Sequence, residues 1–174
     1  MPHIDEPVCV SLYQPEWVGE FATEHRRISE ALRTSFADLE HIGSTAVSGL
    51  AAKPIIDLML GVNGYPPSPA LLQEIERLGY ESLGEAGVPG RLYFRLRSTV
   101  RANLHVVLKG GTHWLSNLAL REYLRAHAGA RERYAQAKLA AIEAGATSLL
   151  SYSAAKAEAL SSLLQEALAA QNAS

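Results

Sequence analysis

A chain of 174 residues with 48% hydrophobic and 20% charged residues is long enough for one domain with a real core, and its composition is that of a soluble globular protein. The formal net charge of −2 gives no strong basic field, so nucleic acid is not an expected partner. A single cysteine, Cys9, excludes an internal disulfide and a cysteine metal site, and no apolar run reaches the roughly 18 residues of a membrane span.

The N-terminal half predicts a helix followed by two strands. The opening MPHIDEPVCV lacks the basic and apolar regions of a signal peptide, so we expect a cytoplasmic protein with no membrane partner. Residues 8–12 read as a short strand-like entry, and apolar residues at helical spacing predict an amphipathic helix over 15–34. Residues 37–42 and 55–62 predict two central strands, the second apolar on both faces except at Asp57.

The C-terminal half adds a hairpin and several helices. The predicted helices lie at residues 70–78, 114–127, 129–144 and 153–171, and the predicted strands at 80–83, 91–97 and 103–108. This order predicts an α+β fold with a mixed sheet of about four to five strands. We expect one domain over residues 1–174, with a sheet-containing core at about 8–110 and a helical segment at about 114–171.

The stretch EHIGSTAVSGLAAKPIIDLMLGV is the strongest candidate for a ligand site, because small, polar and charged residues lie between apolar runs. Gly43 allows a close approach of the backbone to a ligand, and Ser44 and Thr45 add hydroxyls and amides that can hold phosphate. Lys53 is interpreted as a cation opposite this turn, the alternative being a solvated lysine. Asp57 is the first candidate for catalysis, the alternative being a buried structural carboxylate paired with a neighbouring cation.

Two histidines accompany this stretch. His41 is interpreted either as a phosphate ligand or acid/base, or as a strand-end histidine hydrogen-bonded to backbone. His105 lies on the second hairpin strand, where it is a candidate partner of Asp57 in catalysis or metal binding.

Further basic and aromatic residues are candidates for the wall of the same site. Arg91, Tyr93 and Arg95 share one face of the predicted hairpin, which is either a basic wall for a polyanion or an exposed charged sheet face. Arg121 and Arg125 lie four residues apart on a helix and either reach the site or pair with nearby glutamates.

Tyr152 and Lys156 share a helix face in a Tyr-x-x-x-Lys pattern, which short-chain dehydrogenases use for proton transfer. The chain lacks the glycine-rich dinucleotide turn that such enzymes need, so we interpret the two residues only as candidates for the border of the site.

The spacing of Gly43-Ser44 and Asp57 resembles that of polymerase-beta-like nucleotidyltransferases, in which carboxylates hold two divalent ions. Met59 stands at the second carboxylate position and His105 at the third. The resemblance implies Mg²⁺ or Mn²⁺ as a cofactor, held by Asp57 and His105, at a site that is incomplete.

A longer resemblance joins this stretch to VPGRLYFRL, NLHVV and LREYLRAH, and on these motifs the chain is identified as a member of the GrpB family of small nucleotidyltransferase-fold proteins. The resemblance implies binding of a nucleotide or another phosphorylated small molecule, with nucleotidyl or phosphoryl transfer if the chain is catalytic. The alternative is a non-catalytic binding module. Family members joined to dephospho-coenzyme A kinase imply a link to coenzyme A metabolism. The substrate and the oligomeric state stay open.

Overall fold

Strand β2 is the apolar run that the sequence predicts as a central strand, and the computed structural model, which describes residues 5–173, confirms that it lies inside the sheet with a neighbour on each side. The sheet has five strands in the order β1-β2-β5-β4-β3, with β2 and β5 parallel and the other pairs antiparallel. The strands are β1 (Asp38–Ile42), β2 (Ile56–Val62), β3 (Glu81–Ser82), β4 (Arg91–Leu96) and β5 (Ala102–Leu108). The α+β class and the mixed sheet are therefore confirmed.

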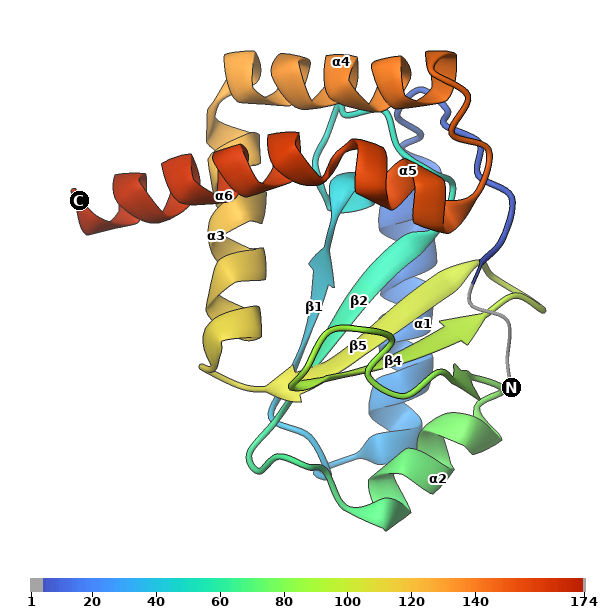
Figure 1. Cartoon of the computed structure of the whole chain (residues 1–174). Coiled ribbons are helices and arrows are strands. Elements are labelled where there is room, and N and C mark those ends of the chain that lie inside the picture. Colours follow the sequence, from blue (N-terminus) through green and yellow to red (C-terminus); the bar gives the residue numbers. More distant parts are fainter. Residues whose placement is uncertain (1–4, 174) are drawn as a thin grey trace.

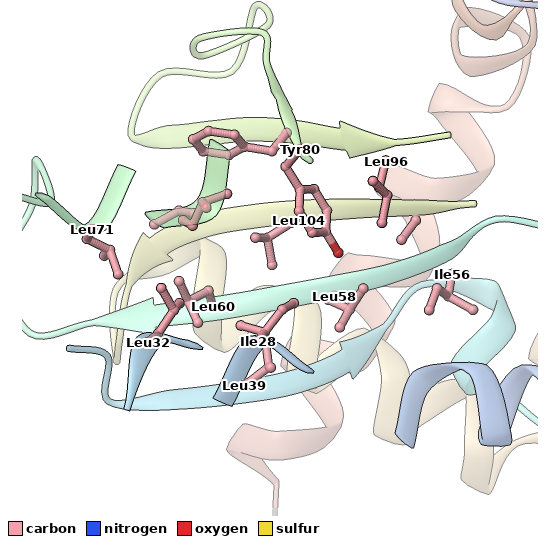
Figure 2. Close-up of a cluster of buried hydrophobic side chains, with 14 of the residues drawn as sticks. Ile28, Leu32, Leu39, Ile56, Leu58, Leu60, Leu71, Tyr80, Leu96 and Leu104 are labelled. Carbon is pink, nitrogen blue, oxygen red and sulfur yellow. The ribbon is translucent and has the colours of Figure 1, made fainter. Parts of the chain in front are cut away.

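Helices α1 and α2 cover one face of this sheet, and α1 lies behind the sheet in the view of Figure 1. The side chains that alternate toward this face form the main core, shown in Figure 2, in which Ile28 and Leu32 of α1 meet Leu58 and Leu60 of β2. All four are at most 2% exposed. The helices of the described chain are α1 (Glu16–Leu32), α2 (Pro69–Arg77), α3 (Thr112–Ala126), α4 (Ala128–Glu143), α5 (Leu149–Ala155) and α6 (Ala157–Asn172).

The opposite face of the sheet is divided between a packed end and an open end. At the packed end, Trp114 of α3 lies on Met59, Val107 and the bare backbone of Gly61, where an added Cβ would come within 2.7 Å of the indole. At the other end, helices α5 and α6 cross in front of the sheet and α4 lies above the strand ends (Figure 1). The sheet face beneath these helices is polar. Every second side chain of β2 and β5 points toward it, and these include Asp57 and His105.

Three expectations about elements need correction. Strand β1 lies at the sheet edge and, among the described strands, pairs with β2 alone, and its acidic residues are typical of a protected edge. Residues 8–12 form no regular strand, and Ser11 makes an isolated bridge to Ala52. The helix predicted at 153–171 is two helices, α5 and α6, which meet at Lys156.

Across residues 5–173, none of the helices combines the length and the apolarity needed to cross a bilayer. The signal-peptide expectation concerns an opening whose residues 1–4 lie outside the described part of the chain.

Candidate functional site

The polar end of the sheet forms the floor of a cavity of about 420 Å³, which we call the central cavity. Its floor comes from β2, β4 and β5, and its rim from the Gly43-Ser44-Thr45 turn and from helix α5. The turn is a short 3₁₀ segment, η1 (Ser44–Ala46), directly after β1. The structure thus brings the candidate turn, the candidate carboxylate and the candidate tyrosine–lysine pair to one place.

Asp57 lies on the floor of the central cavity, with 22% of its side chain exposed. Its Oδ1 accepts a hydrogen bond from Asn103 Nδ2 at 2.7 Å, and His105 Nε2 lies 3.4 Å from the same oxygen. Burial opposes ionisation of this carboxyl, but the bond from His105, the charge of Lys53 and the bond from Asn103 hold its pKa well below the ordinary 3.8. Asp57 is therefore an ionised group at neutral pH.

The backbone of Gly43 fits against the other oxygen of this carboxylate. Gly43 has φ +70°, and a Cβ at this position would lie 2.8 Å from Asp57 Oδ2. Only glycine combines the positive φ with this close approach. The glycine of the turn is thus needed to place β1 beside Asp57.

A chain of polar contacts orients Asn103 toward Asp57. Arg97 Nη2 donates to Asn103 Oδ1 at 2.9 Å, which leaves the amide nitrogen of Asn103 to face Asp57. Arg97 is itself held by Glu6 through Nε at 2.9 Å and Nη2 at 2.6 Å. The N-terminal segment thereby helps to fix the floor of the cavity.

Three lysines, which we call the lysine cluster (Lys53, Lys138 and Lys156), surround this floor. Lys53 and Lys156 line the central cavity, and Lys156 Nζ donates to the hydroxyl of Tyr134 at 3.1 Å. Burial lowers the pKa of Lys53, with Asp57 opposing and Lys156 adding to the shift. Burial also lowers the pKa of Lys138 to about 7, and both other lysines add to that shift.

Lys138 of α4 holds the turn from behind and is 1% exposed. Its Nζ donates to Ser44 Oγ at 2.7 Å and to the carbonyl oxygen of Ala51 at 2.6 Å. Ser44 itself lines the cavity. The buried lysine therefore fixes the position of a serine that a ligand can reach.

His41 lies on the opposite face of the sheet, outside the central cavity. Its ring stacks on Phe21 at a centroid distance of 4.6 Å, and its Nε2 lies 2.9 Å from Thr45 Oγ1. Burial lowers the pKa of His41 to about 4, so the ring is neutral at physiological pH. The strand-end histidine is bonded to a side chain rather than to backbone, and it supports the turn from the α1 side.

The basic wall predicted on the hairpin is only partly present. Arg91 and Tyr93 line the central cavity, with the guanidinium 5.1 Å from the Tyr93 ring centroid, and burial lowers the pKa of Arg91. Among the described residues, Arg91 Nε is a buried polar nitrogen without a hydrogen-bond partner. Arg95 lies on the same face but outside the cavity, paired with Glu81 at 2.6 Å.

The two helix arginines are occupied by protein groups. Arg121 lies on the cavity wall, but its Nη1 donates to Glu40 at 2.6 Å and to the carbonyl of His41 at 2.8 Å. Arg125 lies outside the central cavity and donates to the carbonyl of Ala46 at 2.8 Å. Both arginines tie α3 to the end of β1 and to the turn.

The cavity residues do not fit a two-ion site. Among the described residues, Asp57 is the one carboxylate that lines the cavity, and no group of three His, Cys, Asp or Glu side chains is arranged to hold a metal. Met59, at the second carboxylate position, is 0% exposed and offers no oxygen ligand. The pair Asp57 and His105 is present, but as a hydrogen-bonded pair.

Sequence reasoning missed Lys138, Asn103 and Tyr134. A signal for Lys138 is present in α4, where the buried residues recur at the spacing of an apolar stripe and a lysine occupies one of the positions. A lysine inside a buried stripe is unusual enough to be a candidate. Asn103 carries no comparable signal, since its role depends on the pairing of β2 with β5.

The sheet and its helices give the chain an α+β fold that solved structures of low sequence identity share. A chain of the GLD-2/RNP-8 complex is similar over 73% of this chain and 54% of its own length, with a TM-score of 0.51 at 13% identity. The Cid1 poly(U) polymerase is similar over 74% of this chain and 45% of its own length, with a TM-score of 0.50 at 18% identity. Identities this low show a shared fold alone.

The chain belongs to the GrpB family, whose model, described as GrpB protein, matches residues 7–166. The crystal structure of the conserved protein GrpB from Enterococcus faecalis covers 94% of this chain and 99% of its own, with a TM-score of 0.84 at 34% identity. A UPF0157 protein of Halalkalibacterium halodurans is 33% identical over 99% of this chain and 86% of its own length. The UPF0157 protein YqkA of Bacillus subtilis is 32% identical over 75% of this chain, but the match spans only 38% of that relative's length.

Proposed function

We propose that the central cavity binds a nucleotide or another phosphorylated small molecule. The observation that carries the proposal is the charge of the cavity: Lys53, Lys156 and Arg91 line it and Lys138 lies directly behind, while Asp57 is the one carboxylate among its described lining residues. Burial first, and then the repulsion between neighbouring lysine charges, lowers the pKa values of Lys53 and Lys138. An anionic ligand relieves that repulsion.

The remaining wall of the cavity suits the organic part of such a ligand. Tyr93, Tyr134 and Tyr152 contribute aromatic surface, and Leu149 and Leu160 contribute aliphatic surface. Ligand sites commonly combine an apolar wall with a few placed polar groups, and the volume of about 420 Å³ lies in the range for small molecules. A base or another flat apolar group would lie against the tyrosines while its phosphate faces the lysines.

The direct test is a ligand panel of nucleoside mono-, di- and triphosphates, coenzyme A, dephospho-coenzyme A and inorganic phosphate. We expect thermal stabilisation by at least one phosphorylated ligand and none by its dephosphorylated form. Replacing Lys53 by Met should weaken binding about 10-fold or more, since a hydrogen bond between charged groups contributes roughly 1.5–3 kcal/mol.

The matched control is Lys109→Met. Lys109 is a half-exposed lysine that pairs with Asp38 at 3.1 Å, outside the central cavity. Its loss should leave ligand affinity unchanged. Absence of stabilisation by every phosphorylated ligand, or equal losses in both lysine variants, contradicts the proposal.

Nucleotidyl or phosphoryl transfer is a second candidate function, favoured by the position of the Asp57–His105 pair on the cavity floor. Asp57 would accept the proton of an attacking hydroxyl, and His105 would hold the carboxylate in place. The test is release of pyrophosphate or phosphate from nucleoside triphosphates with Mg²⁺ or Mn²⁺ and an acceptor. Turnover that Asp57→Asn abolishes supports transfer, whereas tight binding without turnover favours the non-catalytic module.

A further inference from the structure

The two-metal pattern would require divalent ions in the central cavity, and the described residues that line this cavity include Lys53, Lys156 and Arg91. We propose that the lysine cluster replaces those ions, so that the cavity binds the phosphate groups of its ligand without a divalent cation. The inference rests on the proposed function and specifies how that function is carried out.

The first argument is that Asp57, the one carboxylate among the described residues that line the cavity, already has hydrogen-bond partners. Oδ1 of Asp57 already faces Asn103 Nδ2 at 2.7 Å and His105 Nε2 at 3.4 Å, and Oδ2 lies against Gly43. A Mg²⁺ ion needs near-octahedral oxygen ligands at about 2.0–2.1 Å and is usually held by one or two carboxylates. Asp57 offers one carboxylate, and its Oδ1 is already hydrogen-bonded to Asn103 and His105.

The second argument is the amount of positive charge. Lys53, Lys138 and Lys156 with Arg91 carry four positive charges when all are protonated, as many as two divalent ions would bring. Asp57 cancels one of them. The remainder matches a diphosphate group that arrives without metal.

The third argument is the arrangement of the donors around the cavity. Lys138 Nζ holds Ser44 Oγ at 2.7 Å, and an ammonium can only donate, so the Ser44 hydroxyl keeps its own proton for an acceptor in the cavity. Lys156 Nζ uses one of its three donors on Tyr134. The Lys53 carbonyl oxygen accepts from the Ile55 N–H, but within the described part of the chain its ammonium makes no side-chain hydrogen bond or ion pair. These groups therefore retain free donors for phosphate oxygens.

The experiment measures binding of pyrophosphate and ADP by titration calorimetry, once with EDTA and once with 5-fold excess Mg²⁺. We expect binding in EDTA, and an affinity several-fold lower with Mg²⁺, because the ion neutralises the charge that the lysines recognise. In EDTA, Lys156→Met should weaken binding 10-fold or more, while Lys109→Met should leave it unchanged.

Circular dichroism checks the fold of each variant, and Lys53→Met serves as a second variant if Lys156→Met does not fold. Binding that occurs only with Mg²⁺ overturns the inference but leaves phosphate binding itself intact. Absence of binding to both probes in both buffers contradicts the inference and the proposed function together. Equal affinities of Lys156→Met, Lys53→Met and the parent protein in EDTA also overturn the inference.

Discussion

Lys138 Nζ lies 2.7 Å from Ser44 Oγ, although the two residues are 94 positions apart in the chain. This bond joins the buried stripe of α4 to the turn at the end of β1. The same ammonium lies 4.2 Å from the centroid of the Tyr134 ring, and Lys53, Lys156 and Asp57 supply the nearby charges. Because burial and both lysines lower its pKa to about 7, Lys138 changes charge near physiological pH.

Ligand affinity should therefore depend on pH through Lys138. Protonated Lys138 attracts an anion, so affinity for sulfate, which stays a dianion, should fall as pH rises through about 7. We expect a loss of up to about 10-fold per pH unit for one linked proton. The measurement is the sulfate Kd between pH 6 and 8.5. In Lys138→Met the affinity should be weaker at pH 6 and nearly flat across the range.

Stability of the unliganded protein should move in the opposite direction. The folded pKa of Lys138 is depressed from the ordinary 10.5 to about 7, so between these values the unfolded chain binds more protons than the folded one. The free energy of unfolding contributed by this group therefore rises with pH across that window, and it has been lost once the pH has fallen to about 7. Denaturant unfolding of parent and Lys138→Met across pH 6–10 checks the sign. If the free energy of unfolding depends on pH in the same way in both proteins, Lys138 does not contribute to that dependence.

Gly43 and Gly49 allow the effect of a clash to be separated from that of backbone conformation. Both have positive φ, +70° and +79°, but only at Gly43 would a Cβ meet another group, Asp57 Oδ2 at 2.8 Å. Gly49→Ala should cost roughly 1 kcal/mol of unfolding free energy, the usual penalty for a non-glycine residue at positive φ. Gly43→Ala should cost about 2–4 kcal/mol, because crowding adds to that penalty. Urea unfolding compares the two variants, and equal losses would show that the contact with Asp57 is not tight.

The elements that the sequence predicts well are those with a strong local pattern. The apolar run of β2, the alternation of β4 and β5 and the periodicity of α1 all appear within a few residues of their expected positions. The break at Lys156 has no local signal because Ala-rich sequence continues through it, and the backbone leaves the helical region there at a single residue, with φ −100° and ψ 2°. The edge position of β1 depends on strand order, which no local pattern records.

The residues of the candidate site also fall into two groups, those that a local sequence pattern predicts and those that only the folded structure brings together. Gly43, Ser44 and Asp57 could be predicted to lie together, since they share one continuous stretch with a short spacing. The contributions of Lys138 and Asn103 could not, because each is made by contacts across 94 and 46 residues of the chain. His41 and Asp57 point to opposite faces because the register pairs His41 with Leu58 of the main core and Ile42 with Asp57.

Glu24 is a buried carboxylate whose removal should be costly. It is 2% exposed, and it accepts hydrogen bonds from Arg27 Nε at 3.1 and 3.0 Å and from the Tyr80 hydroxyl at 2.8 Å. Glu24→Ala should lower the free energy of unfolding by about 3 kcal/mol, because it leaves a partly buried guanidinium and a buried hydroxyl without their acceptor. The matched control is Glu74→Ala, which removes an exposed i,i+3 pair with Arg77 and should cost less than about 0.5 kcal/mol. Comparable losses in both variants, measured by urea unfolding, would contradict the assignment.

The Asp57→Asn variant distinguishes two roles of the Asp57 carboxylate, repulsion of an anionic ligand and binding of a metal ion. Without its charge the cavity becomes more positive, so pyrophosphate in EDTA should bind several-fold more tightly. Unfolding free energy should fall by about 1–3 kcal/mol, because Asn103 and His105 lose an ionised acceptor. The folded pKa of Asp57 is depressed, so this stabilisation is present above the ordinary pKa of 3.8 and is lost as pH falls below it.

The control for this substitution is Asp38→Asn, since Asp38 is a half-exposed carboxylate outside the central cavity that pairs with Lys109. It should change neither pyrophosphate affinity nor its response to Mg²⁺. Calorimetry in EDTA and in Mg²⁺ compares both variants with the parent. If Asp57→Asn instead abolishes a Mg²⁺-dependent affinity while Asp38→Asn does not, the carboxylate holds a metal. If Asp57→Asn binds pyrophosphate more tightly than the parent protein in EDTA, the Asp57 charge weakens the attraction between the lysines and the ligand. The lysines then hold phosphate without a divalent ion.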